Sequence, residues 1–128
     1  MELVYIVISI ALIEYVVFSI LVGKARQDYE VPAPATTGDP VFERYYRVQQ
    51  NTLELLIYFI PGILIFSQYF RADVAAAIGL VFVIGRLFYL KEYIAEPKSR
   101  ALGFLLSFIP AQILLIGGLV GAIMSLME

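Results

Sequence analysis

The sequence contains no cysteine and no histidine, and only 16% of its residues are charged. Without cysteine there is no disulfide framework, no thiol nucleophile and no thiolate metal site. Without histidine the commonest general base is missing, and a transition-metal centre is disfavoured, so we expect no bound metal. An enzyme of this composition would have to take its reactive group from a substrate or cofactor.

Apolar residues make up 61% of the 128 positions, and the mean hydropathy is +0.86. This composition is too apolar for an ordinary water-soluble domain and indicates a membrane protein. The net charge is only -2, and the basic residues are scattered near the membrane segments, so nothing suggests nucleic-acid binding.

Four apolar segments are long enough to cross a bilayer as helices, which takes about 20 residues each. The predicted helices cover about residues 3–23, 40–70, 74–95 and 100–127 of a single integral membrane domain, 1–128. The first segment lacks the basic start and cleavage site of a signal peptide, so we expect it to be retained. The expected fold is an all-α bundle of four transmembrane helices, because the segments lack the alternation typical of a membrane barrel.

Local signals predict where the helices end. Asp39 followed by Pro40 suits the N-cap and first position of the second helix, and Asp73 suits the N-cap of the third. Residues 23–41 carry charges and prolines, which predicts a polar loop. Pro61 predicts a kink within the second helix.

The distribution of basic residues predicts the orientation in the membrane. The first and third loops with their flanking turns hold Lys24, Arg26, Arg44, Arg47, Lys91, Lys98 and Arg100, whereas the opposite side holds only Arg71. By the positive-inside rule, we expect the first and third loops to be cytoplasmic and both termini to lie outside.

Polar side chains form a stripe on the second helix and a second group on the third. The helical period places Arg44, Arg47, Asn51, Glu54 and Tyr58 on one side of the second helix, and Arg86, Tyr89 and Tyr93 on one face of the third. Such groups are costly at the edge of a hydrocarbon layer unless they pair with one another or bind a polar ligand. The spacing leaves two interpretations open: a site for a small zwitterionic ligand with several carboxylates, or a set of interhelix ion pairs.

Glu14 lies near the middle of the first apolar segment. It is either a functional carboxylate or a structural residue that faces the bundle and bonds to a neighbouring helix. Together with Arg86 it also suggests a third, weaker alternative, a small transporter subunit.

The segment 36–54, TTGDPVFERYYRVQQNTLE, resembles the signature of the MAPEG family, the membrane-associated proteins in eicosanoid and glutathione metabolism. The core of that signature falls on Glu43, Arg44, Arg47, Asn51 and Glu54. The segment 85–100, GRLFYLKEYIAEPKSR, looks like the family's third helix and following turn, and four hydrophobic helices in this order cover essentially the full chain.

This resemblance implies a homotrimer that binds glutathione between neighbouring subunits at the cytoplasmic membrane surface. By this likeness the tripeptide would be held by Arg26, Arg47, Gln49, Asn51, Glu54, Tyr89 and Tyr93. Arg26 and Arg47 would lie near its carboxylates and Glu54 near its amine, whereas Arg44 and Glu43 would mainly hold helices together.

The resemblance also implies an activity. Arg100 matches the arginine that stabilises the glutathione thiolate in the cysteinyl-leukotriene synthase branch, so it is the predicted catalytic residue. The expected function is a membrane-bound glutathione transferase, with glutathione-dependent peroxidase activity as an addition, acting on lipophilic electrophiles that arrive from the membrane lipid. Glutathione would then supply the sulfur that this chain lacks.

The sequence departs from the family pattern at three positions. Leu55 stands where the synthase branch tends to have a tyrosine, Gln27 replaces the second of two adjacent basic residues, and Ala101 replaces a serine of the prostaglandin E synthase branch. The last change disfavours that isomerase chemistry. The alternative function is a non-catalytic membrane protein of the same fold that binds lipid or a protein partner, although the retained polar residues argue against it.

Overall fold

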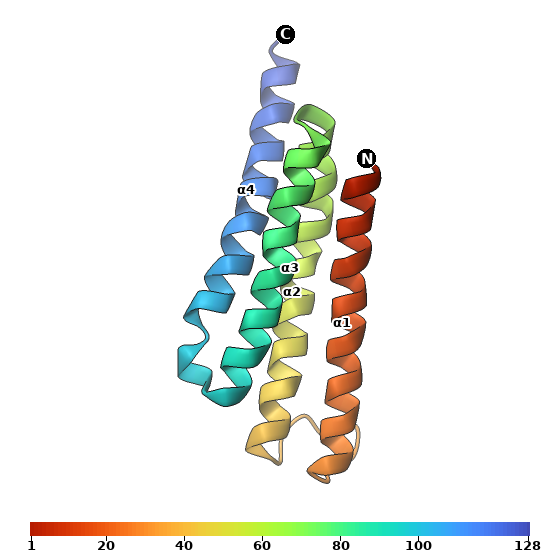
Figure 1. Cartoon of the computed structure of the whole chain (residues 1–128), viewed down its shortest axis with the longest axis vertical. Helices are drawn as coiled ribbons and strands as arrows, with labels where there is room; N and C mark the ends of the chain where they lie inside the picture. Colours follow the sequence, from red (N-terminus) through yellow and green to blue (C-terminus); the bar gives the residue numbers. More distant parts are fainter.

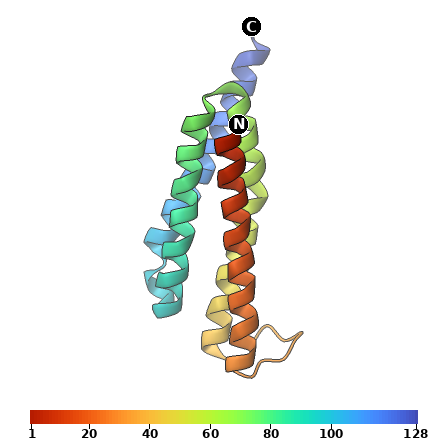
Figure 2. The same cartoon turned by 45° about the vertical axis from the view of Figure 1, so that its right-hand side comes forward.

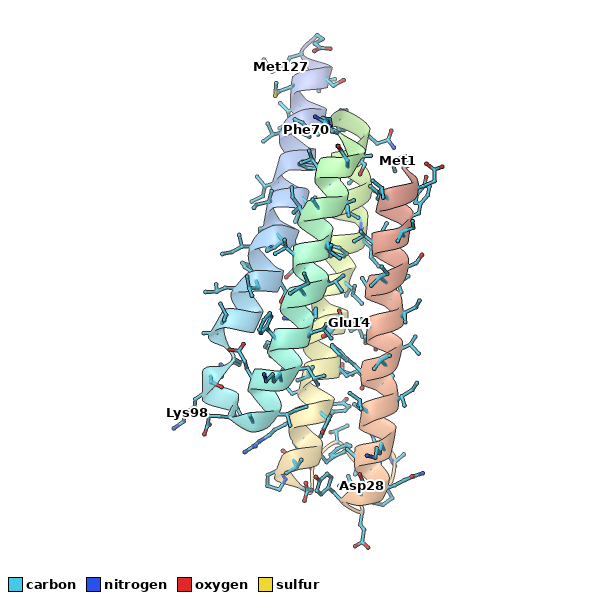
Figure 3. The ribbon with its side chains drawn as sticks, in the orientation of Figure 1. Met1, Glu14, Asp28, Phe70, Lys98 and Met127 are labelled. Carbon is cyan, nitrogen blue, oxygen red and sulfur yellow. The ribbon has the colours of Figure 1, made fainter.

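Four long helices run side by side along nearly the whole chain. The computed structural model describes every residue, 1–128, and its helices are α1 (Glu2–Asp28), α2 (Pro40–Tyr69), α3 (Ala72–Ala95) and α4 (Ala101–Leu126), with a short 3-10 turn, η1 (Pro97–Ser99), before α4. Figure 1 shows an up-and-down bundle with both termini and the α2–α3 turn at one end. The α1–α2 loop and the α3–α4 turn therefore share the other end, where Figure 3 labels Asp28 and Lys98.

Each helix is long and apolar enough to cross a membrane, as the composition predicts. Large hydrophobic side chains such as Ile13, Ile57 and Leu119 are exposed on the outside of the bundle, which suits contact with lipid. The predicted all-α class with four spanning helices is therefore confirmed.

Helix α1 is longer than predicted, because the polar residues after position 23 continue it to Asp28 instead of beginning the loop. Lysine, alanine, arginine and glutamine are all good helix formers, so a change in polarity does not end a helix. The helix stops where Glu30 adopts a left-handed backbone with a φ of 56° and the Val31 amide donates to the Arg26 carbonyl. This is a Schellman ending, which usually uses glycine and is therefore hard to find from sequence when glutamate takes the position.

Helix α2 begins as predicted. Asp39 Oδ1 accepts hydrogen bonds from the amides of Val41 and Phe42, both at 2.9 Å, and Pro40 occupies the first position. The helix continues through Pro61 to Tyr69 as one element.

Helix α3 begins earlier than predicted, at Ala72, so Asp73 is not its N-cap. The N-cap position belongs to Arg71, and Asp73 lies within the first turn, where Arg71 Nη2 donates to its Oδ2 at 2.7 Å. A carboxylate in the first turn still interacts favourably with the positive end of the helix dipole.

Glycines let α3 and α4 approach closely near the loop end of the bundle. A side chain on Gly85 would place its Cβ 2.6 Å from the backbone carbon of Leu106, and one on Gly103 would overlap the backbone of Tyr89. Small residues at helix contacts are the main means by which helices pack within lipid, where no hydrophobic effect drives them together. These contacts hold the start of α4 against the end of α3.

We predict that Gly85→Ala lowers the unfolding temperature of the protein in detergent, because the new methyl group pushes α4 away from α3. Overpacking of this kind costs about 1–3 kcal/mol. The matched control is Gly23→Ala, also within a helix, where nothing lies within 4 Å of the added Cβ. Equal stability of the two variants would contradict the close contact between α3 and α4.

Candidate functional site

A polar pocket of about 390 Å³ lies at the end of the bundle that carries the α1–α2 loop. It is lined by residues of α2, α3 and the start of α4, namely Arg47, Asn51, Tyr89, Tyr93, Arg100 and Phe104. In Figures 1 and 2 this end of α3 and α4 diverges from the neighbouring ends of α1 and α2. The structure thus brings most of the predicted site residues together in one chain.

Helical spacing explains how α2 and α3 present these side chains. Arg47, Asn51 and Glu54 lie on successive turns of α2, and Arg47 Nη2 lies 3.7 Å from Glu54 Oε1 in an ion pair exposed to solvent. Tyr89 and Tyr93 are one turn apart on α3 with ring centroids 5.4 Å apart. The pocket therefore has a charged wall on α2 and an aromatic wall on α3.

Arg100 is held at the edge of the pocket by the turn between α3 and α4. Its Nη1 donates to the carbonyl of Pro97 at 2.9 Å, and its side chain is otherwise exposed. The turn itself is tied down by Glu92, whose Oε1 accepts a hydrogen bond of 2.7 Å from the Gly103 amide. That amide is one of the free donors at the start of α4, so a carboxylate of α3 caps the next helix.

The pocket can bind an anion next to an apolar surface. Arg47 and Arg100 supply two guanidinium groups, Glu54 supplies one carboxylate beside them, and Phe104 borders the pocket with its ring. Arginine binds carboxylates through paired hydrogen bonds, and a nearby carboxylate can accept from an ammonium. A small zwitterion with more carboxylates than amines matches this arrangement.

Arg86 lies buried behind the pocket, with no exposed surface. Its Nε donates to Ser107 Oγ at 2.9 Å, and its Nη1 donates to Asn51 Oδ1 at 2.7 Å and to Thr52 Oγ1 at 3.2 Å. Its guanidinium also lies 4.3 Å from the ring centroid of Tyr89. Asn51 of α2 and Tyr89 of α3, which both line the pocket, therefore contact the same buried guanidinium.

Three of the predicted site residues, Arg26, Gln49 and Glu54, are not in the lining of this pocket. Arg26 Nη1 donates to the carbonyls of Val31 and Ala35 in the α1–α2 loop, at 3.3 and 2.7 Å, and its guanidinium lies over the Phe42 ring. Gln49 Nε2 donates to Ser19 Oγ of α1 at 2.9 Å. Arg26 is thus part of α1, and Gln49 lies on the side of α2 that contacts α1. Glu54 is connected to the pocket only through its ion pair with Arg47.

Arg44 and Glu43, the two signature residues expected to hold helices together, make different kinds of contact. Arg44 Nη1 donates to the Ile94 carbonyl at 2.8 Å and so joins α2 to α3, as expected. Glu43 Oε2 instead accepts from the Gly38 amide at 3.2 Å, so it holds the preceding loop and not another helix. Phe104 was missed from sequence, although its position one turn after Arg100 is a usable signal.

Comparisons with known proteins identify the family of this chain. The sequence model described as "MAPEG family" matches residues 3–120. The chain is 40% identical over 120 residues to an uncharacterized protein from Synechocystis sp., covering 94% of this chain and 88% of that one. It is 43% identical over 103 residues to microsomal glutathione S-transferase 2 from Homo sapiens, covering 80% and 70% of the two chains. Leukotriene C4 synthase from Bos taurus is 33% identical over 114 residues, covering 75% and 76%.

We predict that Arg44→Gln destabilises the protein more than Arg47→Gln, although both remove one arginine from the same face of α2. The first loses a hydrogen bond between a charged donor and the Ile94 carbonyl, worth about 1.5–3 kcal/mol. The second loses an exposed ion pair worth less than about 1 kcal/mol. Thermal unfolding of both variants in the same detergent checks this, and an equal loss would contradict the division of roles.

Proposed function

Because this chain belongs to the MAPEG family, we propose that it is a membrane-bound glutathione transferase. It binds glutathione in the polar pocket and activates the thiol for attack on lipophilic electrophiles that reach the pocket from the bilayer. The observation that carries the proposal is the convergence of Arg47, Asn51, Tyr89, Tyr93 and Arg100 on one pocket.

The charges of glutathione complement those of the pocket. The tripeptide carries two carboxylates, one ammonium and one thiol. Arg47 binds a carboxylate, Glu54 binds the ammonium, and Asn51 and the two tyrosines offer hydrogen bonds to the peptide groups. These assignments place the thiol toward the remaining cation, Arg100.

Arg100 supplies the chemistry in this proposal. A free thiol has a pKa of about 8.5, so only a small part is thiolate at neutral pH, and a fixed cation beside the sulfur lowers that value. The thiol proton leaves to water at the mouth of the pocket. The thiolate sulfur then donates its electron pair to the electrophilic carbon, a C–S bond forms, and the leaving group or opened ring takes up the displaced electron pair.

The same thiolate accounts for the proposed peroxidase activity. Its sulfur attacks the terminal oxygen of a lipid hydroperoxide, the O–O bond breaks, and the lipid leaves as an alcohol once protonated. A second glutathione then attacks the oxidised sulfur, which releases glutathione disulfide and water. Two thiols are oxidised for each hydroperoxide reduced.

We further propose that the working unit is a homotrimer with each site completed by a neighbouring subunit. The division of the predicted residues supports this, since Arg26 and Gln49 lie on the α1 side of the chain and not in its own pocket. A second copy that brings its α1 side to the pocket would add the guanidinium of Arg26 to a glutathione carboxylate.

The proposed orientation places the pocket at the cytoplasmic surface. The end of the bundle with the α1–α2 loop and the α3–α4 turn holds most of the basic residues, whereas Arg71 lies at the other end, in the α2–α3 turn. The positive-inside rule then makes both termini external.

We predict that calorimetry detects glutathione binding to the purified protein and that the ultraviolet absorbance of a thiolate appears on binding at neutral pH. The physical reason is stabilisation of the anion by the pocket cations. The methyl thioether of glutathione, which cannot ionise, is the matched control ligand and should bind without this absorbance. Tight lipid binding with neither glutathione binding nor conjugation to a generic electrophile would contradict the proposal and favour the non-catalytic alternative.

We predict that Arg100→Ala lowers kcat by about 100-fold or more but weakens glutathione binding only slightly. Arg100 stabilises charge chiefly in the reacting state, and removal of one such group costs about 2.7–4 kcal/mol in other enzymes. The matched control is Arg71→Ala, which removes an exposed arginine at the opposite end of the bundle. Unchanged turnover in the Arg100 variant would refute its role.

A further inference from the structure

Two buried side chains of opposite charge lie inside the bundle and are not needed to hold glutathione directly. Glu14 of α1 is 7% exposed and Arg86 of α3 is 0% exposed, and no other charged side chain in the chain is buried. Figure 3 shows Glu14 about halfway along α1, well away from both ends of the bundle. Each charge is costly in a membrane interior unless the other compensates it.

Glu14 has no hydrogen-bond partner within the chain. Both of its carboxyl oxygens are buried without a partner, and so is Nη2 of Arg86. The two groups are more than 4.0 Å apart, so they form no direct ion pair, yet each acts electrostatically on the other. The structural interpretation of Glu14 is therefore right that the residue faces the bundle but wrong that it bonds to a neighbouring helix. These three unpartnered polar atoms therefore have only each other's charge to compensate them.

Arg86 also contacts two residues that line the pocket. Its Nη1 binds Asn51 Oδ1, which leaves the Asn51 Nδ2 donors for a ligand, and its guanidinium lies against the Tyr89 ring. Asn51 and Tyr89 both line the pocket. A change at Glu14 can therefore reach the pocket through one intervening side chain.

We propose that Glu14 and Arg86 form a buried charge pair. Arg86 positions Asn51 and Tyr89, and the negative charge of Glu14 reduces the positive potential that Arg86 creates in the pocket. Both are positioning residues. This inference rests in part on the proposed function, because the quantity that the charge pair changes is the pKa of the bound glutathione thiol.

The sign of the electrostatic effect follows from the groups around the pair. The titratable groups close enough to act electrostatically on Arg86 are Glu14 of α1, Tyr58 of α2 and Tyr89 of its own helix, and the neutral Ser107 of α4 accepts its hydrogen bond. The cations Arg47 and Arg100 act on Tyr89 from the pocket side, and Glu54 acts on Tyr58. Loss of the Glu14 charge leaves the positive charge of Arg86 uncompensated, which lowers the pKa of the bound thiol. Loss of the Arg86 charge raises that pKa.

The first arm of the test needs no glutathione. Thermal unfolding is measured for the full chain in detergent as wild type, Glu14→Gln, Arg86→Gln and the double variant. Each single change leaves one buried charge without its partner and should lower the unfolding temperature by about 5 °C or more, and the double variant should be more stable than the sum of the two losses. Glu2→Gln is the matched control, because it removes the same charge from an exposed position in the same helix. Additive losses would overturn the charge pair.

The second arm measures thiolate absorbance of bound glutathione against pH. Glu14→Gln should move the midpoint down by about half a pH unit and Arg86→Gln should move it up by at least as much, with Glu2→Gln unchanged. An unmoved midpoint in Glu14→Gln, in protein whose wild type forms thiolate, overturns the effect on the pocket. Absence of thiolate in the wild type overturns the proposed function and this effect together, while the first arm still decides whether the pair exists.

Discussion

The guanidinium of Arg86 connects three helices at the base of the pocket. It donates to Asn51 and Thr52 of α2 and to Ser107 of α4, while its own backbone belongs to α3. In a protein surrounded by lipid, a buried cation is tolerated only where such bonds and an opposite charge compensate it. The pocket depends on this arrangement, because the Arg86 guanidinium fixes the position of its α2 wall relative to its α3 wall. Separating the two helices would break these hydrogen bonds and leave a buried charge without partners.

The second constraint is the close packing of α3 and α4 near the turn that carries Arg100. Gly85 and Gly103 let the two backbones approach, and Glu92 caps the start of α4 through the Gly103 amide. A short turn and two close contacts leave little freedom for the segment between them. In this way an exposed arginine can occupy a defined place without being buried itself.

Much of this architecture was predictable because its causes are local. Hydrophobic length predicts the four helices, Asp39 and Pro40 predict the start of α2, and the helical period predicts that Arg47 and Asn51 share a face. The end of α1 was not predictable, since it depends on Glu30 in a left-handed conformation that usually belongs to glycine. The network of Arg86 was also missed, because its partners come from positions 21, 34 and 35 residues away and no local pattern records such contacts.

The central claim is that one polar pocket in each chain is a glutathione site that activates the sulfur through Arg100. A structure of the assembled protein in lipid with bound glutathione tests it most directly. The account predicts one tripeptide in the pocket of Arg47, Asn51 and Tyr93, its sulfur beside the Arg100 guanidinium, and Arg26 from a neighbouring copy on a carboxylate. Glutathione bound elsewhere on the protein, or bound in the pocket with its sulfur directed away from Arg100, would contradict it.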